Sequence, residues 1–344
     1  MRSRILGILT FAALAACGDE RVELLGAGAT FPYPLYFQWS ADYQAETGVR
    51  INYQSIGSGG GIQQLSAGTV DFGASDAPMT DEEMSRAQGG EILHIPTVLG
   101  AVSVAYNLPG LTEPVRLTGE LVADVYLGRI TRWNDARIAA VNPGVALPDE
   151  AILPVHRSDG SGTTYVFTEY LAAVSPPWGS GPGSGKEVAW PTGIGARGNE
   201  GVAAQVKATP HTLGYIEVVY ANQNELQTAA IQNLAGTFVQ ARPETITAAA
   251  AGVVDTLSES TDYRLSVVNA PGEQAYPITS FTWILLYRDQ PNAVKGEVLV
   301  EFLRWAVTDG QERAASLDYG PLPARMRERL VTRLDSVRIG SATP

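Results

Sequence analysis

The fold of this chain is decided near its start by the stretch VELLGAGATFPYPLYFQWSADYQAE, residues 22–46. The apolar run Val22–Leu25 predicts a strand, and Pro32–Glu46 predicts a helix with its prolines in the first turn, where proline is tolerated. A turn of small residues connects the two. Further along the chain, short apolar runs keep alternating with stretches of helical period, which predicts α/β architecture.

Two later turns repeat this design. One is GSGGG (57–61), which follows a predicted strand at Val49–Ser55, and the other is RSDGSGTT (157–164), which follows a predicted strand at Ile152–His156. Each leads into a predicted helix, at Gly60–Ala67 and Thr163–Ala173. Neither the phosphate-loop pattern nor the dinucleotide fingerprint is present in these turns.

The three turns indicate an anion site. The first turn of a helix carries unpaired N–H groups at the positive end of the helix dipole, and together these bind anions. Four hydroxyls in the turns would add O–H donors: Thr30, Ser58, Ser161 and Thr163. Taken alone, each turn has a plainer interpretation, in which the hydroxyl caps its own helix.

Two charged residues favour one shared site over plain capping. Arg157 supplies a cation with a rigid fork of donors, and Asp76 follows a short predicted strand, Asp71–Ala74. In open α/β sheets, ligands bind beyond the carboxyl ends of the strands, where all these residues would lie.

The remaining elements extend the same alternation. Further helices are predicted at Thr80–Gln88, where Thr80 and Glu83 form a capping box, and at Glu120–Leu127, Gly201–Lys207 and Ala293–Val307. Further strands are predicted at Ile92–Pro96, Ala101–Asn107, Leu213–Ile216 and Trp283–Tyr287. The stretch Ser175–Lys186, rich in Pro, Gly and Ser, is predicted to be a surface loop.

Composition excludes several classes of protein. The 344 residues are enough for about two domains at roughly 150 residues each. The formal net charge of −12 disfavours a nucleic-acid binder, which would carry a basic footprint. The single cysteine, Cys17, rules out an internal disulfide and a cysteine-based zinc site. Because the three histidines are scattered, no metal site and no cofactor are predicted.

The N-terminus has the pattern of an export signal. Arg2 and Arg4 precede the apolar run Ile5–Ala16, which is too short to cross a bilayer core that needs about 20 residues. Cys17 then stands where the cleavage site of a signal peptide ends, and this arrangement resembles a bacterial lipobox. The resemblance implies a signal peptide at 1–16, acylation of Cys17 and a short linker to residue 21; two or more acyl chains suffice for stable anchoring. The alternative is a buried helix at the start of the fold.

Several longer sequence motifs resemble those of one protein family. GAGATFP (26–32), TVDFGASDAPMT (69–80), DGSGT (159–163) and YPITS (276–280) resemble the periplasmic phosphate-binding proteins of the Pst ABC transporters, as do WPTGIGARGNEGVAA (190–204) and LDYGPLP (317–323). The resemblance implies a class II periplasmic binding protein, with two α/β lobes joined by two crossing strands and closing on one phosphate. Lobe I would comprise residues 22–98 and 275–344, and lobe II residues 99–274.

The resemblance also implies a set of phosphate contacts. Carried onto this sequence, they fall on Thr30, Phe31, Ser58, Asp76, Arg157, Ser161, Gly162 and Thr163. Phe31 and Gly162 would act through their backbone N–H groups, and Asp159 would pair with Arg157 and hold its fork in place. One departure is Gly59, where the family would have a second serine after Ser58.

Asp76 is the most informative of these residues. At neutral pH inorganic phosphate still carries at least one proton, which an ionised Asp76 would accept. Sulfate has no proton to offer, and a site built around one donor–acceptor pair discriminates by about 10⁴–10⁵ against the analogue that lacks it. The alternative is that Asp76 is a turn or capping residue before Pro78.

Three other functions compete with phosphate binding. A binding protein for another tetrahedral oxyanion is the nearest alternative, and a surface or adhesive role of the same fold stays open. A serine-based phosphoryl-transfer enzyme would use Ser58 or Ser161 with His156 as its base, but His156 neighbours Arg157 on a strand and should face the opposite side. We therefore expect that this chain is not an enzyme. The resemblance implies an ABC permease and its ATPase as partners, a membrane contact only through the lipid anchor, and a monomer in the periplasm.

Overall fold

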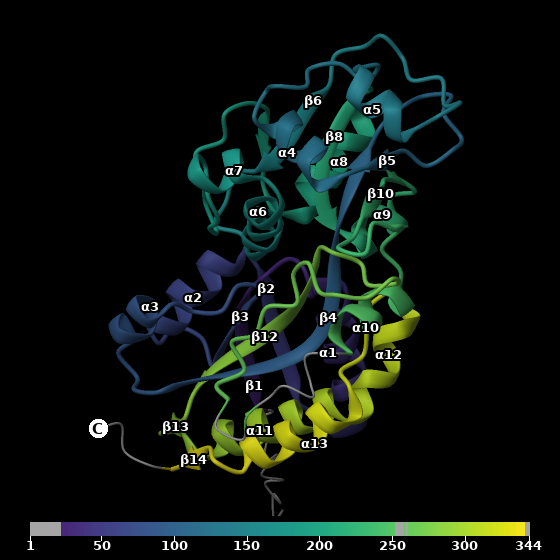
Figure 1. The fold of residues 1–344 in the computed structure, drawn as a ribbon. Helices are drawn as coiled ribbons and strands as arrows, with labels where there is room; N and C mark the ends of the chain where they lie inside the picture. Colours follow the sequence, from purple (N-terminus) through teal and green to yellow (C-terminus); the bar gives the residue numbers. More distant parts are fainter. Residues whose placement is uncertain (1–21, 252–257, 259–260, 341–344) are drawn as a thin grey trace, which may run out of the picture.

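The computed structural model describes residues 22–251, 258 and 261–340. The predicted signal peptide, Cys17 and the linker to residue 21 lie outside the described residues. Two α/β lobes stand one above the other (Figure 1), with the N-terminal strand and the C-terminal helices in the lower one, lobe I. No helix in the described part of the chain is long and apolar enough to cross a membrane.

The strands of lobe I follow the predicted strand–turn–helix order. They are β1 (Glu23–Gly28), β2 (Arg50–Ser55), β3 (Phe72–Ser75) and β12 (Thr279–Tyr287), in the spatial order β2-β1-β3-β12. β1 runs parallel to both of its neighbours. The carboxyl ends of β1, β2 and β3 therefore meet at one edge of the sheet, which faces the other lobe.

One long strand crosses between the lobes. β4 (Ile92–Tyr106) has 15 residues, all buried. Its first part pairs antiparallel with β12 as far as Ala101, and its last part, from Val102, pairs antiparallel with β8 (Thr212–Glu217) of lobe II. The prediction of two separate strands, ending at Pro96 and restarting at Ala101, was wrong. Pro96 stays in the strand because the β4–β12 ladder shifts register beside it, and bulges tolerate a missing N–H.

Lobe II continues the same sheet. Its strands β6 (Leu153–Arg157) and β7 (Ile194–Ala196) extend the order β4-β8-β6-β7, and β9 (Gln227–Thr228) pairs with β4. A small second sheet has the order β11-β10-β5, from Phe238–Val239, Ala230–Gln232 and Arg116–Leu117. A two-stranded ladder of β13 (Asp289–Gln290) and β14 (Arg338–Ile339) lies in lobe I.

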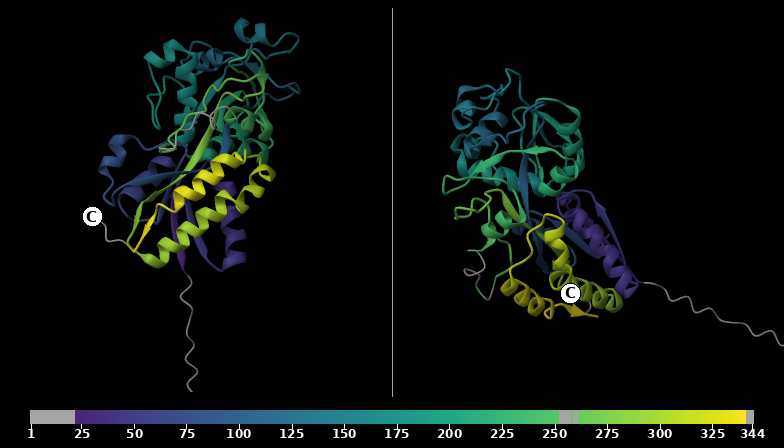
Figure 2. Two further views of the ribbon diagram at one scale, coloured as in Figure 1. Left: turned by 60° about the horizontal axis from the view of Figure 1, so that its bottom comes forward. Right: turned by 90° about the vertical axis from the view of Figure 1, so that its right-hand side faces the viewer.

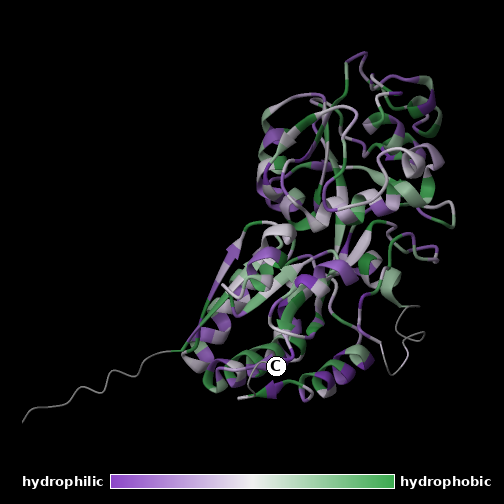
Figure 3. Ribbon diagram, turned by 90° about the vertical axis from the view of Figure 1, so that its left-hand side faces the viewer, coloured by the Kyte–Doolittle hydropathy of each residue, from purple (hydrophilic) through white to green (hydrophobic). Residues whose placement is uncertain are grey.

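Helices cover the sheets of both lobes (Figure 2). Lobe I carries α1 (Tyr33–Thr47), α2 (Ser58–Ser66), α3 (Asp81–Arg86), α11 (Ala293–Val307), η2 (Asp309–Gln311), α12 (Glu312–Ser316) and α13 (Ala324–Leu334). Lobe II carries α4 (Gly119–Tyr126), α5 (Ala136–Val141), α6 (Gly162–Val174), α7 (Pro176–Ser180), α8 (Gly198–Ala208) and α9 (Val218–Gln223). In Figure 3 the outer helices are banded in purple and green, as expected where one face packs on the core.

Part of the predicted surface loop 175–186 is helical. α7 begins at Pro176, where proline suits the first turn, and Ser175 caps it by accepting a hydrogen bond from the N–H of Trp178. The Trp178 side chain is fully buried, and its Nε1 donates to the carbonyl of Gly183 at 2.8 Å. The buried Trp178 side chain fixes the conformation of this segment, although its composition alone predicted a loop.

The lobe boundaries at 98/99 and 274/275 stay a prediction. The segment before the second boundary contacts both lobes. Asn233 of lobe II donates from its Nδ2 to the carbonyls of Gly272 and Glu273 at 3.0 Å each, whereas residues 263 and 264 contact lobe I. Arg264 pairs with Asp81 at 2.7 Å, and the carbonyl of Tyr263 accepts a hydrogen bond from Trp283 Nε1 at 2.8 Å. α10 (Pro243–Ala250) packs against β4, the strand that crosses between the lobes.

Candidate functional site

The three glycine turns meet where the lobes touch. The N–H of Gly59 donates to the carbonyl of Gly160 at 2.9 Å, which joins the second turn directly to the third. A Cβ atom at Gly162 would lie 2.5 Å from Ser58 Oγ and 2.6 Å from Asp76 Oδ2, so only glycine allows this approach. The structure brings together all eight residues predicted from the resemblance, and each of them is buried: Thr30, Phe31, Ser58, Asp76, Arg157, Ser161, Gly162 and Thr163.

The first turn is held by three tyrosine hydroxyls. Tyr53, Tyr220 and Tyr319 donate to the three successive carbonyls of residues 29, 30 and 31, at 2.7, 2.6 and 2.6 Å. Burial raises the pKa of all three tyrosines, so their hydroxyls stay protonated donors. In a trans peptide the N–H points away from the preceding carbonyl. Fixing the carbonyls of Ala29 and Thr30 therefore fixes the directions of the N–H groups of Thr30 and Phe31.

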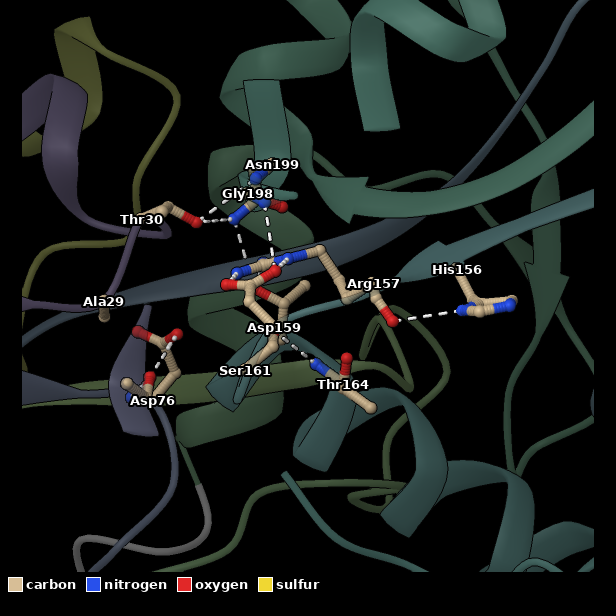
Figure 4. A network of polar contacts seen from close by, with 12 residues as sticks. Ala29, Thr30, Asp76, His156, Arg157, Asp159, Ser161, Thr164, Gly198 and Asn199 are labelled. Atoms are coloured by element: carbon tan, nitrogen blue, oxygen red, sulfur yellow. Dashed lines mark hydrogen bonds and ion pairs between the residues drawn. The ribbon is translucent and has the colours of Figure 1, made fainter. Parts of the chain in front are cut away.

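Arg157 is buried with a bidentate partner (Figure 4). Its Nε and Nη2 donate to the two carboxylate oxygens of Asp159 at 2.8 and 2.6 Å. Burial works to raise the pKa of Asp159, but the hydrogen bonds and charge of Arg157 outweigh it and leave that pKa below its usual value. Asp159 is thus an anion that holds the guanidinium fork, while Nη1 faces Thr163 Oγ1 at 3.3 Å.

Asp76 lies beside the second turn on the lobe I side. Its Oδ1 accepts a hydrogen bond from Thr282 Oγ1 at 2.7 Å, and its Oδ2 accepts one from Ser58 Oγ at 3.3 Å. Burial raises the pKa of Asp76 to about 7, against the lowering effects of the Thr282 hydroxyl, the Arg157 charge and the Ser58 hydroxyl. Near neutral pH this carboxyl can therefore either accept or donate a proton.

The capping alternative accounts for one of the four hydroxyls. Ser161 Oγ accepts a hydrogen bond from the N–H of Thr164 at 3.0 Å and so caps α6. Thr30 and Ser58 are not the N-cap residues of α1 and α2, which are Pro32 and Gly57. Thr30, Ser58 and Thr163 instead interact with side chains of the site.

Two polar residues of the site were missed by the sequence analysis. Thr282 lies on the crossing strand β12, where a run of buried residues hides which side chain reaches Asp76. Asn199 is fully buried at the start of α8, and its Nδ2 donates to Thr30 Oγ1 at 2.7 Å. The predicted helix began at Gly201, whereas α8 begins at Gly198. The available signal was the pair Gly198-Asn199, one residue before the predicted helix.

His156 lies away from these residues. Its ring stacks on Trp190 with a centroid separation of 4.8 Å, and its Nδ1 contacts the carbonyl of Arg157 at 3.0 Å. Figure 4 shows the ring on the far side of the Arg157 backbone. Within residues 22–251, 258 and 261–340, no group of three or more His, Cys, Asp or Glu side chains could hold a metal ion.

The comparisons with known proteins identify the family. A family model described as PBP superfamily domain matches residues 15–310. The phosphate-binding protein PstS of Xylella fastidiosa (strain 9a5c) is 46% identical over 313 residues, covering 90% of this chain and 84% of that protein. The chain belongs to the PstS family of the PBP superfamily. A more distant PstS protein, from Methanocaldococcus jannaschii, is 38% identical and covers 83% of this chain and 78% of its own length.

Solved structures share the fold with this PstS family member. A phosphate-binding protein from Stenotrophomonas maltophilia has a TM-score of 0.72 at 19% identity and covers 91% of this chain and 94% of its own. The periplasmic phosphate-binding protein PfluDING, bound with phosphate, has a TM-score of 0.71 at 21% identity, with 90% and 93% covered. The predicted fold class, a two-lobed α/β periplasmic binding protein, is confirmed.

Proposed function

We propose that this chain binds inorganic phosphate between its two lobes and delivers it to an ABC permease and its ATPase for import. The main support for the proposal is that the carboxyl of Asp76 is buried among hydrogen-bond donors. Its neighbours in the site are the hydroxyls of Ser58 and Thr282 and the charge of Arg157. A buried carboxyl in an anion site needs a ligand that brings its own proton, and phosphate does.

Eight residues would contact the phosphate. Arg157 would supply the positive charge, and the N–H groups of Phe31 and Gly162 would join the hydroxyls of the three turns in binding its oxygens: Thr30, Ser58, Ser161 and Thr163. Such charge-assisted hydrogen bonds are about twice as strong as neutral ones. Asp76 would accept the phosphate proton, and Asp159 would keep Arg157 in place from outside the contact shell.

The setting proposed for this binding is the periplasm. The N-terminal pattern supports export and a lipid anchor at Cys17, and the structural neighbour PfluDING is a periplasmic phosphate-binding protein. We propose that the chain acts as a tethered monomer and is a binding protein, not an enzyme. The place of His156, stacked on Trp190 and turned from both serines, supports the second part.

Calorimetric titration tests the proposal. The full chain, stripped of ligand by partial unfolding and refolded, would be titrated with phosphate, arsenate and sulfate, beside Asp76→Asn and a matched control, Asp149→Asn. Asp149 is exposed and pairs with Arg132 on the surface of lobe II, so it offers the same change of charge far from the site.

At pH 8, where Asp76 is mostly ionised, we expect the wild type and the control to bind phosphate and arsenate and to bind sulfate far more weakly. Asp76→Asn should lose phosphate selectivity and accept sulfate, because an amide donates where the carboxylate accepted. Sulfate binding by the wild type as tight as phosphate binding would show a general oxyanion receptor instead. Absence of binding to all three anions would reject the proposal altogether.

A further inference from the structure

Asn199 joins two hydroxyls that belong to different lobes. Its Nδ2 donates to Thr30 Oγ1 of lobe I at 2.7 Å and to Thr163 Oγ1 of lobe II at 3.1 Å. Its backbone N–H also donates to Thr30 Oγ1, at 3.2 Å. Figure 4 shows Asn199 lying above Arg157, with Thr30 reaching toward it. These bonds use both hydrogens of the Asn199 side-chain amide, so its NH₂ group has none left for a ligand.

The orientation of the Asn199 amide follows from its third partner. The backbone N–H of Glu217 points at Asn199 Oδ1 from 2.9 Å. A backbone N–H can only donate, so the atom that faces it must be the carbonyl oxygen. The NH₂ group is thereby turned toward the two threonines, with one hydrogen for each.

A count of lone pairs then decides what the threonine hydroxyls can do. A hydroxyl oxygen accepts at most two hydrogen bonds and donates one. Thr30 Oγ1 receives the side-chain and backbone N–H groups of Asn199, and Thr163 Oγ1 receives Asn199 Nδ2 and Arg157 Nη1. Both acceptor positions are taken on each oxygen. Each O–H can therefore only donate.

We propose that Asn199 is a positioning residue that makes Thr30 and Thr163 obligate hydrogen-bond donors toward the anion when the lobes close. This inference rests on the proposed function, because it assigns the polarity of that same site. The Thr30 bonds link lobe I to lobe II, so the first hydroxyl is set only in the closed arrangement. Asp76 then remains as the acceptor for the proton of the ligand.

The first variant reverses the hydrogen-bond polarity at nearly constant shape and also adds a negative charge, so the double-mutant cycle below, which uses the neutral Asn199→Ala, separates orientation of the hydroxyls from charge. Asn199→Asp puts a carboxylate oxygen where the NH₂ group stood, so that both hydroxyls turn to donate to it and present lone pairs to the anion. Asn199→Ala leaves the hydroxyls free to rotate. Asn292→Asp is the matched control, because Asn292 caps α11 by accepting from the N–H of Lys295, which an aspartate does equally well.

Phosphate titration of the full chain measures the effect. One lost hydrogen bond changes an equilibrium by roughly tenfold or less, so we expect a loss of about 3- to 10-fold for Asn199→Ala. For Asn199→Asp, where two donors become acceptors, we expect a loss of at least about 100-fold. The control should stay within about twofold of the wild type. Equal losses in both Asn199 variants would overturn the proposal, since a purely structural role does not depend on polarity.

A double-mutant cycle keeps the test decisive if Asn199→Asp does not fold. When Thr30 and Thr163 are both replaced by valine, Asn199→Ala should cost less than about twofold in phosphate affinity, because nothing is left for the amide to orient. An additive loss in that background would contradict the inference. Failure of the wild type to bind phosphate would instead reject the proposed function, so the two failures are distinct.

Discussion

At the scale of single residues, the proposed anion selectivity depends on Asp76. Burial raises the pKa of Asp76 to about 7 despite hydrogen bonds from two hydroxyls and the Arg157 charge. Above that pH the carboxylate is an acceptor and demands a protonated ligand. Below it the group is a neutral acid, which donates a hydrogen bond and no longer repels a bare anion.

Sulfate affinity should therefore rise as the pH falls. The protonated fraction of a group with a pKa of about 7 grows by about tenfold between pH 8 and pH 6, so the association constant for sulfate should grow by about the same factor. Titration across this range measures it, and Asp76→Asn should show a flat profile. If the sulfate affinity of the wild type did not change with pH, Asp76 would not face the ligand.

Residues in the turns could be predicted from the sequence, whereas their supports could not. Thr30, Ser58 and Arg157 lie in glycine-rich turns between a predicted strand and a predicted helix, and such turns can be recognised in the sequence. Asn199 and Thr282 reach the site from a helix start and a buried strand, and their roles depend on which partner lies across the lobe interface. A single sequence carries no direct signal of such contacts.

At the scale of elements, local patterns predicted most strands and helices but not how they continue. β4 was predicted as two strands, Ile92–Pro96 and Ala101–Asn107, yet pairing with β12 and then β8 keeps it continuous through Pro96. Long-range pairing outweighs one missing N–H, since a bulge absorbs it. The first turn of α2 behaves differently: there a change at Gly59 matters because Gly160 of the other lobe lies directly opposite.

Gly59→Ser should weaken phosphate binding slightly. A Cβ atom at Gly59 would lie 3.2 Å from Gly160 Cα and 3.3 Å from its carbonyl oxygen, so the two turns must separate by a few tenths of an ångström. That strains the Gly59–Gly160 hydrogen bond, whose net contribution is about 0.5–1.5 kcal/mol, which corresponds to about 2- to 10-fold in affinity.

The matched control for Gly59→Ser is Gly201→Ser in α8, where a Cβ atom would meet nothing closer than 3.7 Å. It should leave phosphate affinity within about twofold. If calorimetry gave Gly59→Ser the affinity of the wild type, the contact between the two turns would not contribute to closure.

At the scale of the whole molecule, an ion pair outside the site also joins the two lobes. Lys186 Nζ lies 2.6 Å from Glu83 Oε1, and both side chains are largely shielded from solvent. Glu83 belongs to α3 of lobe I, while the carbonyl of Lys186 accepts the N–H of Ser161 at the start of α6. The pair therefore ties α3 to the turn that carries Ser161 and Gly162, and it can form only when the lobes are together.

Lys186→Met should speed phosphate release. Surface ion pairs contribute about 0–1 kcal/mol, and partial shielding puts this pair toward the upper end, so we expect a dissociation rate about 2- to 6-fold faster. The association rate should change less, because changes at an interface act mostly on dissociation. Lysine is the residue to replace, since Glu83 also completes the capping box of α3 with Thr80.

Salt separates the ion pair from the loss of side-chain packing. Stopped-flow release from the wild type should approach the rate of Lys186→Met as ionic strength rises, whereas the variant itself should respond little, because screening acts on the charges alone. Arg132→Met, which removes an exposed pair with Asp149 inside lobe II, should leave release unchanged. If Lys186→Met released phosphate at the wild-type rate in low salt, closure would be driven by the ligand and the turns alone.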